Sequence, residues 1–359
     1  MARRHGRMNM RILVLRGGAL GDFLVTLPAL GLLRAKWPAA RIELVGNART
    51  AELGMLGGFL DSAHSQHEAR WSALYRDSAL PPTMAAWLGE FDLVVNYWAD
   101  PDGTLVRRFP VRPGQTTVAG TAVPALAPAA RHFCEPLKAL GLATDDFRSR
   151  LELGRVLRDA PQRRRRFEDE PSCPIAIHPG SGSAGKNWPA ERWTELIARL
   201  KRPILLVLGE AELGTWNASL LARLRTAGGG DVTRESRDRK TGGHRIEIAA
   251  DLPLPELANM LAGCRQFIGH DSGVSHLAAA VGTPSVLLFG PTDPAMWAPP
   301  GGHVRVIHHG PAVDAISVEE VLEALRTHHR APQDHLPDRG PPGGAPSRGS
   351  PGLPDGRPS

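Results

Sequence analysis

The feature that most constrains the fold is the regular alternation of short apolar runs with helix-like segments. Short, continuously apolar runs are typical of strands that are buried on both faces of a parallel sheet, which places the chain in the α/β class. Because the pattern occurs in both halves, the sequence predicts two doubly wound, Rossmann-like domains. The runs lie at 12–15, 42–45, 93–96, 174–178, 203–209, 266–270 and 284–290, and the helix-like segments at 48–55, 189–200, 213–225, 255–262, 273–280 and 318–328.

The length of the chain agrees with two domains, because 359 residues exceed the usual size of one hydrophobic core. A stretch rich in Arg, Asp, Glu and Pro separates the two halves. A tail rich in Pro and Gly, a composition that cannot bury a core, ends the chain. We therefore predict an N-terminal domain at 1–150, a linker at 151–173, a C-terminal domain at 174–313, a final helix at 314–330 and a disordered tail at 331–359.

Composition and charge limit the classes of function. Three widely spaced cysteines without a Cys-x-x-Cys pair argue against a disulfide framework or a zinc site. No apolar run is long enough to span a membrane, and the one after the basic start is too short for a signal peptide, so we expect a cytoplasmic protein. The net charge of +6 indicates an anionic partner, such as a phosphorylated acceptor or a membrane surface. Nucleic acid is not expected, because no recognised binding motif accompanies the basic residues.

The stretch GGALGDFLVTLPAL places a carboxylate, Asp22, directly after the first apolar run. The carboxyl end of a parallel strand is where open α/β sheets bind ligands. Asp22 is therefore either a base that takes a proton from a substrate or a cap of the following helix. A dinucleotide oxidoreductase is disfavoured, because Gly17, Gly18 and Gly21 do not have G-x-G-x-x-G spacing and Glu43 is a weak candidate for a ribose ligand.

The stretch HPGSGSAGKNWPAERW lies between an apolar run and a helix. Backbone amides at such a position favour an anion. We predict a diphosphate cradle over Ser181, Gly182 and Ser183, in which the two hydroxyls donate hydrogen bonds and Lys186 supplies positive charge. A plain Gly-rich turn is the alternative. A magnesium-dependent P-loop is disfavoured, because Asn187 stands where a Ser or Thr would hold the metal.

The stretch FIGHDSGVSHLAAAVGTPSVLLFGPTDP carries a second polar group past a strand end. Asp271, Ser272, Gly273 and His276 stand at the start of a predicted helix, where we expect them to bind phosphate or ribose. Ser272 as a simple helix cap is the alternative. The spacing of His270, Asp271 and His276 is not that of a metal site, and D-S-G-V is not the G-x-S-x-G elbow of serine hydrolases.

Together and in this order, over about residues 10–300, the three stretches resemble glycosyltransferase family nine, the ADP-heptose lipopolysaccharide heptosyltransferases. The resemblance implies the GT-B fold, in which two Rossmann-like domains face each other across a cleft and the C-terminal domain holds the donor. It implies that Asp22 is the catalytic carboxylate, that Lys186 contacts the donor phosphates and that the Asp271 block holds the nucleotide diphosphate. Glu210 lies where the family places an acidic residue on the nucleoside, with Glu212 as an alternative.

The chemistry implied is the transfer of a sugar from a nucleotide diphosphate. One candidate carboxylate and no second nucleophile indicate a single displacement with inversion, and without a D-x-D motif we expect no metal or other cofactor. The expected partners are an ADP-sugar donor, such as ADP-heptose, and an anionic lipid-linked glycan acceptor that Arg16 and Gly18 would contact, with peripheral contact to the inner membrane. A non-catalytic nucleotide-sugar-binding protein and a nucleotide-dependent phosphotransferase are the alternatives.

Overall fold

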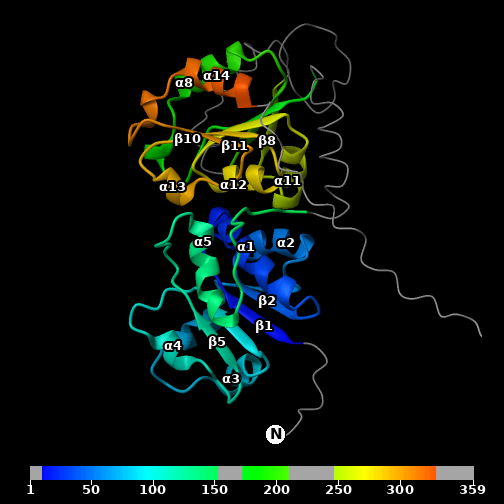
Figure 1. Cartoon of the computed structure of the whole chain (residues 1–359), viewed down its shortest axis with the longest axis vertical. Coiled ribbons are helices and arrows are strands. Elements are labelled where there is room, and N and C mark those ends of the chain that lie inside the picture. The colour runs from blue at the N-terminus through cyan, green and yellow to red at the C-terminus, as the bar shows by residue number, and fades with distance from the viewer. Residues whose placement is uncertain (1–9, 153–171, 210–245, 329–359) are drawn as a thin grey trace, which may run out of the picture.

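The structure is a computed structural model that describes residues 10–152, 172–209 and 246–328. The predictions made for Glu210 and Glu212, for a helix at 213–225, for most of the linker and for the tail at 331–359 lie outside the described residues. Within them the chain forms two parallel sheets, one in each half, with helices on both faces of each sheet (Figure 1).

The first sheet has the strand order β3-β2-β1-β4-β5, so β1 lies at its centre. Its order reverses between β1 and β4, which is the kind of point where doubly wound sheets bind ligands. The strands are β1 (Arg11–Leu15), β2 (Arg41–Gly46), β3 (Ser62–Ser65), β4 (Leu93–Asn96) and β5 (Thr116–Ala119). The helices are α1 (Leu20–Lys36), α2 (Ala48–Leu56), α3 (Pro82–Leu88), α4 (Thr104–Arg108) and α5 (Ala129–Cys134), with the 3₁₀ turns η1 (Ala69–Tyr75) and η2 (Glu135–Leu140).

The second sheet has the strand order β11-β10-β9-β6-β7-β8, with β9 and β6 at its centre. The strands are β6 (Ile175–His178), β7 (Ile204–Leu208), β8 (Ile246–Ala250), β9 (Gln266–His270), β10 (Ser285–Phe289) and β11 (Val304–His308). The described helices are α8 (Ala190–Arg199), α11 (Leu254–Ala262), α12 (Gly273–Ala280), α13 (Pro294–Trp297) and α14 (Val318–His328), with the 3₁₀ turns η3 (Ala184–Lys186) and η4 (Val313–Ala315).

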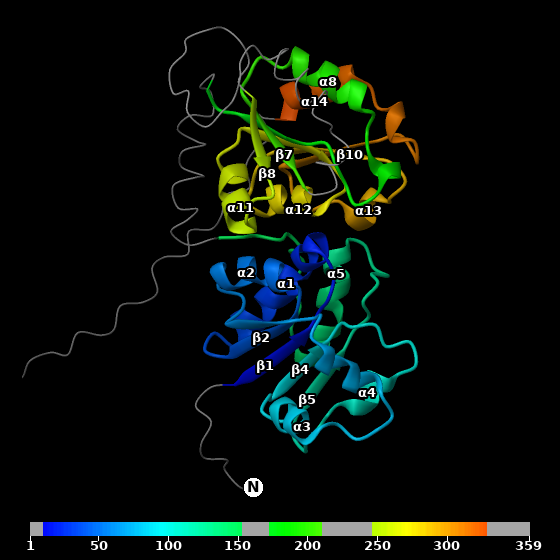
Figure 2. The ribbon, with the colours of Figure 1, turned by 180° about the vertical axis from the view of Figure 1, so that it is seen from behind.

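Alternate residues of each strand pack on opposite faces of its sheet, as the pleat requires. On β1, Val14 belongs to the core on the α1 side, whereas Leu13 belongs to the core that contains Trp71 and Phe91. Figures 1 and 2 show α1, α2 and α5 of the first domain turned toward α11, α12 and α13 of the second, while α8 and α14 cover the far side of the second sheet. The interface between the two domains is therefore formed by helices that lie between the two sheets.

The junction between the domains is packed. The core cluster on the α1 side of the first sheet continues into residues of α11 and α12, such as Ala258 and Leu277. The backbone also crosses the junction, because the amide of Leu151 donates to the carbonyl of Ala280 at 2.9 Å. The first turn of α1 is thereby held against the first turn of α12.

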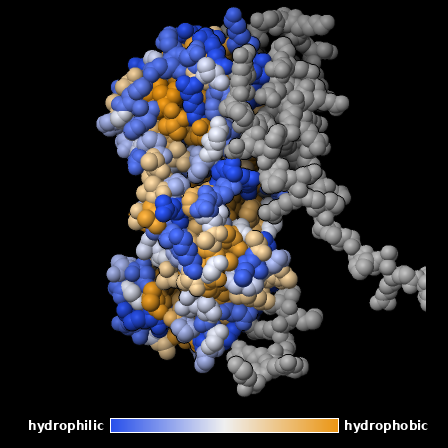
Figure 3. Space-filling view, in the orientation of Figure 1, coloured by the Kyte–Doolittle hydropathy of each residue, from blue (hydrophilic) through white to orange (hydrophobic). Residues whose placement is uncertain are grey.

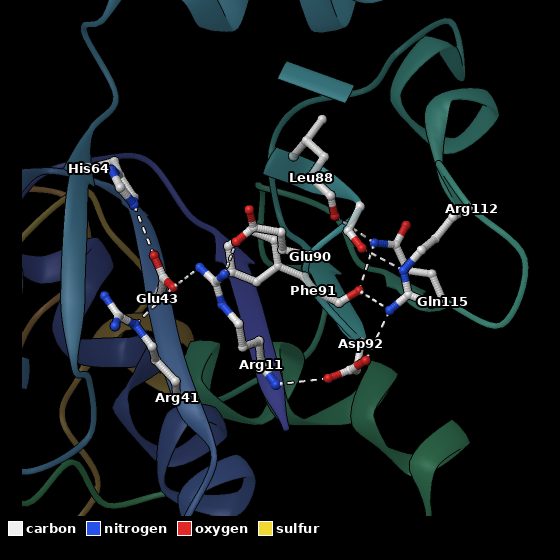
Figure 4. Close-up of polar contacts among 11 residues, drawn as sticks. Arg11, Arg41, Glu43, His64, Leu88, Glu90, Phe91, Asp92, Arg112 and Gln115 are labelled. Atoms are coloured by element: carbon white, nitrogen blue, oxygen red, sulfur yellow. Dashed lines mark hydrogen bonds and ion pairs between the residues drawn. The ribbon is translucent and has the colours of Figure 1, made fainter. Parts of the chain in front are cut away.

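The buried carboxylate of Glu43, in the first sheet, forms ion pairs away from this junction. Glu43, which is 2% exposed on β2, contacts Arg11 Nη2 at 2.5 Å, Arg41 Nε at 3.1 Å and His64 Nε2 at 3.1 Å (Figure 4). Burial alone raises the pKa of Glu43, but the hydrogen bonds from Arg11 and His64 lower it below the ordinary value. Glu43 therefore has a structural role in the sheet, and this disfavours it further as a ribose ligand.

On the face drawn in Figure 3, hydrophilic residues are interspersed with small apolar patches in both domains. Within the three described ranges, no helix combines the length and the apolar character that a bilayer span needs.

Candidate active site

The site is built where the first turns of two helices from different domains meet. A Cβ atom placed on Gly273, the first residue of α12, would lie 2.8 Å from Cβ of Leu20 and 3.0 Å from the backbone nitrogen of Gly21, both in α1. The positive ends of both helix dipoles therefore converge at the junction. This arrangement brings Asp22 of the first domain toward the Asp271 block of the second.

Asp22 is the third residue of α1, and its carboxylate is held on both sides. Oδ2 accepts a hydrogen bond from the amide of Ala19 at 2.9 Å, and Oδ1 lies 3.0 Å from Nη2 of Arg16. The side chain is nevertheless 38% exposed. An ionised carboxylate has about four lone-pair positions, so it can still accept a proton from a hydroxyl while both contacts persist. Asp22 thus caps its helix, as the alternative interpretation proposed, and is also open to a substrate.

Arg16 does not lie where we expected it. It is only 6% exposed and packs under α1, with its guanidinium carbon 4.3 Å from the centre of the Phe133 ring. Burial lowers the pKa of Arg16, and the charge of Asp22 opposes that effect. The expected contact between Arg16 and an anionic acceptor does not fit this placement, because the guanidinium is directed at Asp22 and away from solvent.

Gly18 lies in the exposed turn between β1 and α1. Its φ of +113° is one that residues with a side chain rarely adopt, and a Cβ atom there would lie 2.5 Å from Oδ2 of Asp22. Its amide donates to Oε1 of Gln66 at 3.1 Å. Gly18 therefore keeps the space beside the carboxylate open, and its contact with an acceptor stays a prediction.

The predicted phosphate loop runs between β6 and α8, and the hydroxyl of Ser181 makes hydrogen bonds within the loop. Oγ of Ser181 is 2.8 Å from the carbonyl of Ser183 and 2.7 Å from Oδ1 of Asn187, and it accepts from the amide of Ser183. Because Ser181 is also buried, its hydroxyl shapes the loop, and it can donate only one hydrogen bond. Gly182 and Ser183 are exposed, and their contact with a diphosphate stays a prediction.

Lys186 is the last residue of the 3₁₀ turn η3, and its side chain contacts the Asp271 block. Its Nζ lies 2.7 Å from Oδ2 of Asp271, and the exposed fractions of the two side chains are 27% and 10%. The two stretches that were 85 positions apart in the sequence are therefore joined by an ion pair at the strand ends. The pair leaves the ammonium group at the edge of the site, where an anion can reach it.

The start of α12 completes the site. Oγ of Ser272 accepts from the amide of Ser275 at 3.3 Å, so Ser272 does cap the helix. Helix geometry leaves the amides of Gly273 and Val274 without an intrahelical acceptor. His276, one turn further, is buried at 6% exposure, and burial lowers its pKa, opposed by the charges of Asp271 and Asp22. The imidazole thus lies within electrostatic reach of a carboxylate from each domain.

The approach of the two helices yields a prediction for Gly273. We expect Gly273→Ala to lower the free energy of unfolding by about 1–3 kcal/mol, because the added methyl group overpacks the junction against Leu20 and the backbone of Gly21. Urea unfolding measures the change. Gly302→Ala is the matched control, since a Cβ atom at Gly302 meets nothing within 4 Å. Equal stability of the two variants would contradict the packed junction.

His270 holds the phosphate loop in place. It is fully buried at the end of β9, and its Nε2 accepts from the amide of Trp188 at 2.8 Å. Burial lowers the pKa of His270 to about 3, with a further contribution from His178, so the ring is neutral. Although His270 is close to Asp271 and His276 in the sequence, its role in the structure is to hold the loop that contains Trp188. Among the residues that the structure describes, no group of three or more His, Cys, Asp or Glu side chains could hold a metal ion.

The depressed pKa of His270 predicts a pH dependence of stability. The unfolded chain binds a proton at His270 below about pH 6.5, whereas the folded protein does so only near pH 3. Stability is therefore lost as the pH falls through that window, by roughly 2 kcal/mol between pH 7 and pH 5 from this residue. Urea unfolding at both pH values should show a shallower loss for His270→Gln, which keeps an acceptor for Trp188 but does not titrate. Parallel losses in the two proteins would refute the assignment.

Several functional contacts were not predicted from the sequence. Thr26, whose Oγ1 accepts from Nε of Arg16 at 3.1 Å and donates to the carbonyl of Asp22 at 2.8 Å, belongs to the site. Its position four residues after Asp22 on one helix face was a usable signal. The roles of Gln66 and His270 had no comparable signal, because each depends on a partner distant in the sequence.

Comparison with known families defines the class of protein. The sequence profile of glycosyltransferase family 9 (heptosyltransferase) matches residues 129–320, which is more than half of the chain. The chain therefore belongs to this family.

Individual relatives agree with that assignment. Lipopolysaccharide heptosyltransferase 1 of Escherichia coli K12 is 29% identical over 143 residues, which is 39% of each chain. The chain thus matches about two fifths of the length of this curated relative. The solved glycosyltransferase family 9 structure from Veillonella parvula superposes with a TM-score of 0.66 at 20% identity, covering 91% of this chain and 99% of the other.

Two further solved structures share the fold. The E. coli heptosyltransferase WaaC with ADP superposes with a TM-score of 0.61 at 19% identity, covering 89% of this chain and all of the other. The iron-containing dodecameric heptosyltransferase TibC, in complex with ADP-D-beta-D-heptose, has a TM-score of 0.51 at 17% identity, covering 90% and 76%. These likenesses confirm the predicted GT-B fold of two Rossmann-like domains.

Proposed function

We propose that this protein is an inverting, metal-independent glycosyltransferase that moves heptose from ADP-heptose onto an anionic, lipid-linked glycan of the lipopolysaccharide core. The observation that carries the proposal is the meeting of α1 and α12. At this junction the accessible carboxylate of Asp22 belongs to one domain and the pair of Lys186 and Asp271 to the other, which supports a base from the first and positive charge from the second.

The second domain would bind the donor. A diphosphate at the start of α12 would accept hydrogen bonds from the amides of Gly273 and Val274 and would benefit from the helix dipole. The exposed Gly182 and Ser183 would contact the same phosphates, and Lys186 would neutralise their charge. The family's role for Glu210 on the nucleoside completes the proposed donor site.

The reaction would be a single displacement. The acceptor hydroxyl attacks the anomeric carbon as its proton passes to a carboxylate oxygen of Asp22, and the bond from that carbon to the phosphate oxygen breaks. The electron pair leaves with ADP, whose developing negative charge Lys186 and the α12 amides stabilise. Attack from the face opposite the leaving group inverts the anomeric centre. Since these groups supply the positive charge, the proposal includes no metal ion.

The first domain would receive the acceptor. The exposed turn at Gly18 leads directly to Asp22, so a glycan hydroxyl can approach from that side. Exposed apolar side chains of the same domain, Val106 at 53% and Val123 at 75%, together with the neighbouring Arg107, support peripheral contact with an anionic membrane on the cytoplasmic side.

Isothermal titration with ADP, UDP, GDP and NAD, each with and without magnesium, tests the nucleotide part of the proposal. We expect ADP to bind most tightly, with the same affinity in both conditions. Binding that requires magnesium would favour the phosphotransferase alternative, and selective binding of NAD would favour an oxidoreductase. Binding of ADP-heptose without transfer to any core acceptor would favour the non-catalytic alternative.

A further inference from the structure

We propose that Arg16 is a positioning residue that fixes the orientation of the Asp22 carboxylate for proton transfer. The inference rests on the proposed function, in which Asp22 is the base. It assigns to Arg16 a role in the chemistry without contact to either substrate.

The guanidinium group is fixed by three neighbours. Nε donates to Oγ1 of Thr26 at 3.1 Å, and Nη2 lies 3.0 Å from Oδ1 and 3.4 Å from the carbonyl oxygen of Asp22. Its face stacks on the Phe133 ring, with the guanidinium carbon 4.3 Å from the ring centre. These contacts fix the planar guanidinium in one orientation, and its hydrogen bond to Oδ1 fixes the orientation of the Asp22 carboxylate.

The Phe133 ring, which supports the guanidinium, is itself held by Tyr97. The ring of Tyr97 meets that of Phe133 edge to face, with centroids 5.4 Å apart, and the Tyr97 hydroxyl donates to the carbonyl of Phe133 at 2.5 Å. Both residues are buried. The chain of contacts from β4 through α5 to Arg16 therefore forms a rigid base for the charge, which is the support that a catalytic group requires.

The location of the charge points to function. Arg16 is 6% exposed, and enclosing a guanidinium costs desolvation energy that one half-exposed carboxylate repays poorly. The lowered pKa of Arg16 agrees with that cost. The outer arginines of the same domain differ in this respect: Arg112, for example, is 24% exposed and pairs with Asp92 at 2.9 Å. A buried charge paired with a carboxylate at the junction is explained by control of that carboxylate.

The free side of Asp22 is consistent with this role. Arg16 contacts Oδ1 and the Ala19 amide contacts Oδ2, and the side chain is still 38% exposed with both contacts in place. The acceptor hydroxyl would meet a base that cannot rotate. Without Arg16, Oδ1 would be free to turn, and a misplacement of about 1 Å at a reacting group costs about 100-fold in rate.

Arg16→Gln and Asp22→Asn, singly and combined, test the inference in the full-length protein with ADP-heptose and a core acceptor. We expect Arg16→Gln to lower kcat about 100-fold with an unchanged Kd for ADP. In the Asp22→Asn background the same change should have no further effect, because Arg16 acts only through that carboxylate. Arg16→Lys should give an intermediate rate, since an ammonium group cannot reach both Thr26 and Asp22.

Thr26→Val provides a second variant, because it keeps the buried charge and removes only the hydroxyl that receives Nε. Its kcat should fall by about 10-fold, again with no effect in the Asp22→Asn background. Arg112→Gln is the control and should keep the wild-type kcat. A wild-type kcat in Arg16→Gln, or an equal loss with and without the Asp22 carboxylate, would overturn the inference. Absence of transfer by the wild-type protein would instead refute the proposed function.

Discussion

Asp22→Asn is expected to lower kcat about 10²- to 10⁴-fold while the Kd for ADP changes less than about twofold. The amide has nearly the shape of the carboxylate but cannot accept a proton from the acceptor hydroxyl, and general base catalysis accounts for a loss of this size. Nucleotide affinity should persist, because the donor groups belong to the second domain.

The measurement combines the rate of heptose transfer with isothermal titration of ADP. Asp92→Asn is a matched control, since Asp92 is also partly exposed at 31% and pairs with an arginine, but it lies beside β4 away from the junction. Asp92→Asn should keep the wild-type kcat. A normal kcat in Asp22→Asn would remove Asp22 from the chemistry and leave it as the cap of α1.

Lys186→Ala is expected to weaken ADP binding by about 30-fold or more. The variant removes the ammonium group that would neutralise the diphosphate, and it leaves Asp271, only 10% exposed, as an unpaired negative charge beside the ligand. Truncation of one partner of such a buried pair typically costs about 2–5 kcal/mol. The titration should therefore show a much larger effect than an exposed lysine would give.

The double variant Lys186→Ala with Asp271→Asn separates the two contributions. If the unpaired carboxylate repels the diphosphate, the second change should restore part of the affinity that the first removed. Lys138→Ala is the control, because Lys138 is 56% exposed and pairs with Glu135. Unchanged ADP affinity in Lys186→Ala would contradict the proposed donor site.

The inner strands of both sheets were predictable, and the outer strands were not. All seven apolar runs correspond to strands, from β1 to β10, because each is buried on both faces. The missed strands β3, β5, β8 and β11 have sequences such as SAHS and TTVA, in which partly or fully exposed polar residues interrupt the apolar pattern. All four are edge strands of their sheets, so within the described ranges each has one side without a neighbouring strand.

The candidate site was predictable in its parts and not in its contacts. Motif spacing indicated Asp22, Lys186 and Asp271, because each follows a strand at the edge where parallel sheets bind ligands. The burial of Arg16 could not be predicted, since it depends on Phe133, which is 117 positions further along the chain. The closed hydrogen bonds of Ser181 likewise depend on the loop conformation.

The most direct test of the central claim is the mass of a heptose-deficient lipopolysaccharide core acceptor after incubation with ADP-heptose and the purified protein. We predict that the acceptor gains one heptose residue, that ADP appears in equal amount, and that Asp22→Asn slows both about 10²- to 10⁴-fold. An acceptor of unchanged mass, alongside tight binding of ADP-heptose, would contradict the claim that the junction of α1 and α12 is a transferase active site.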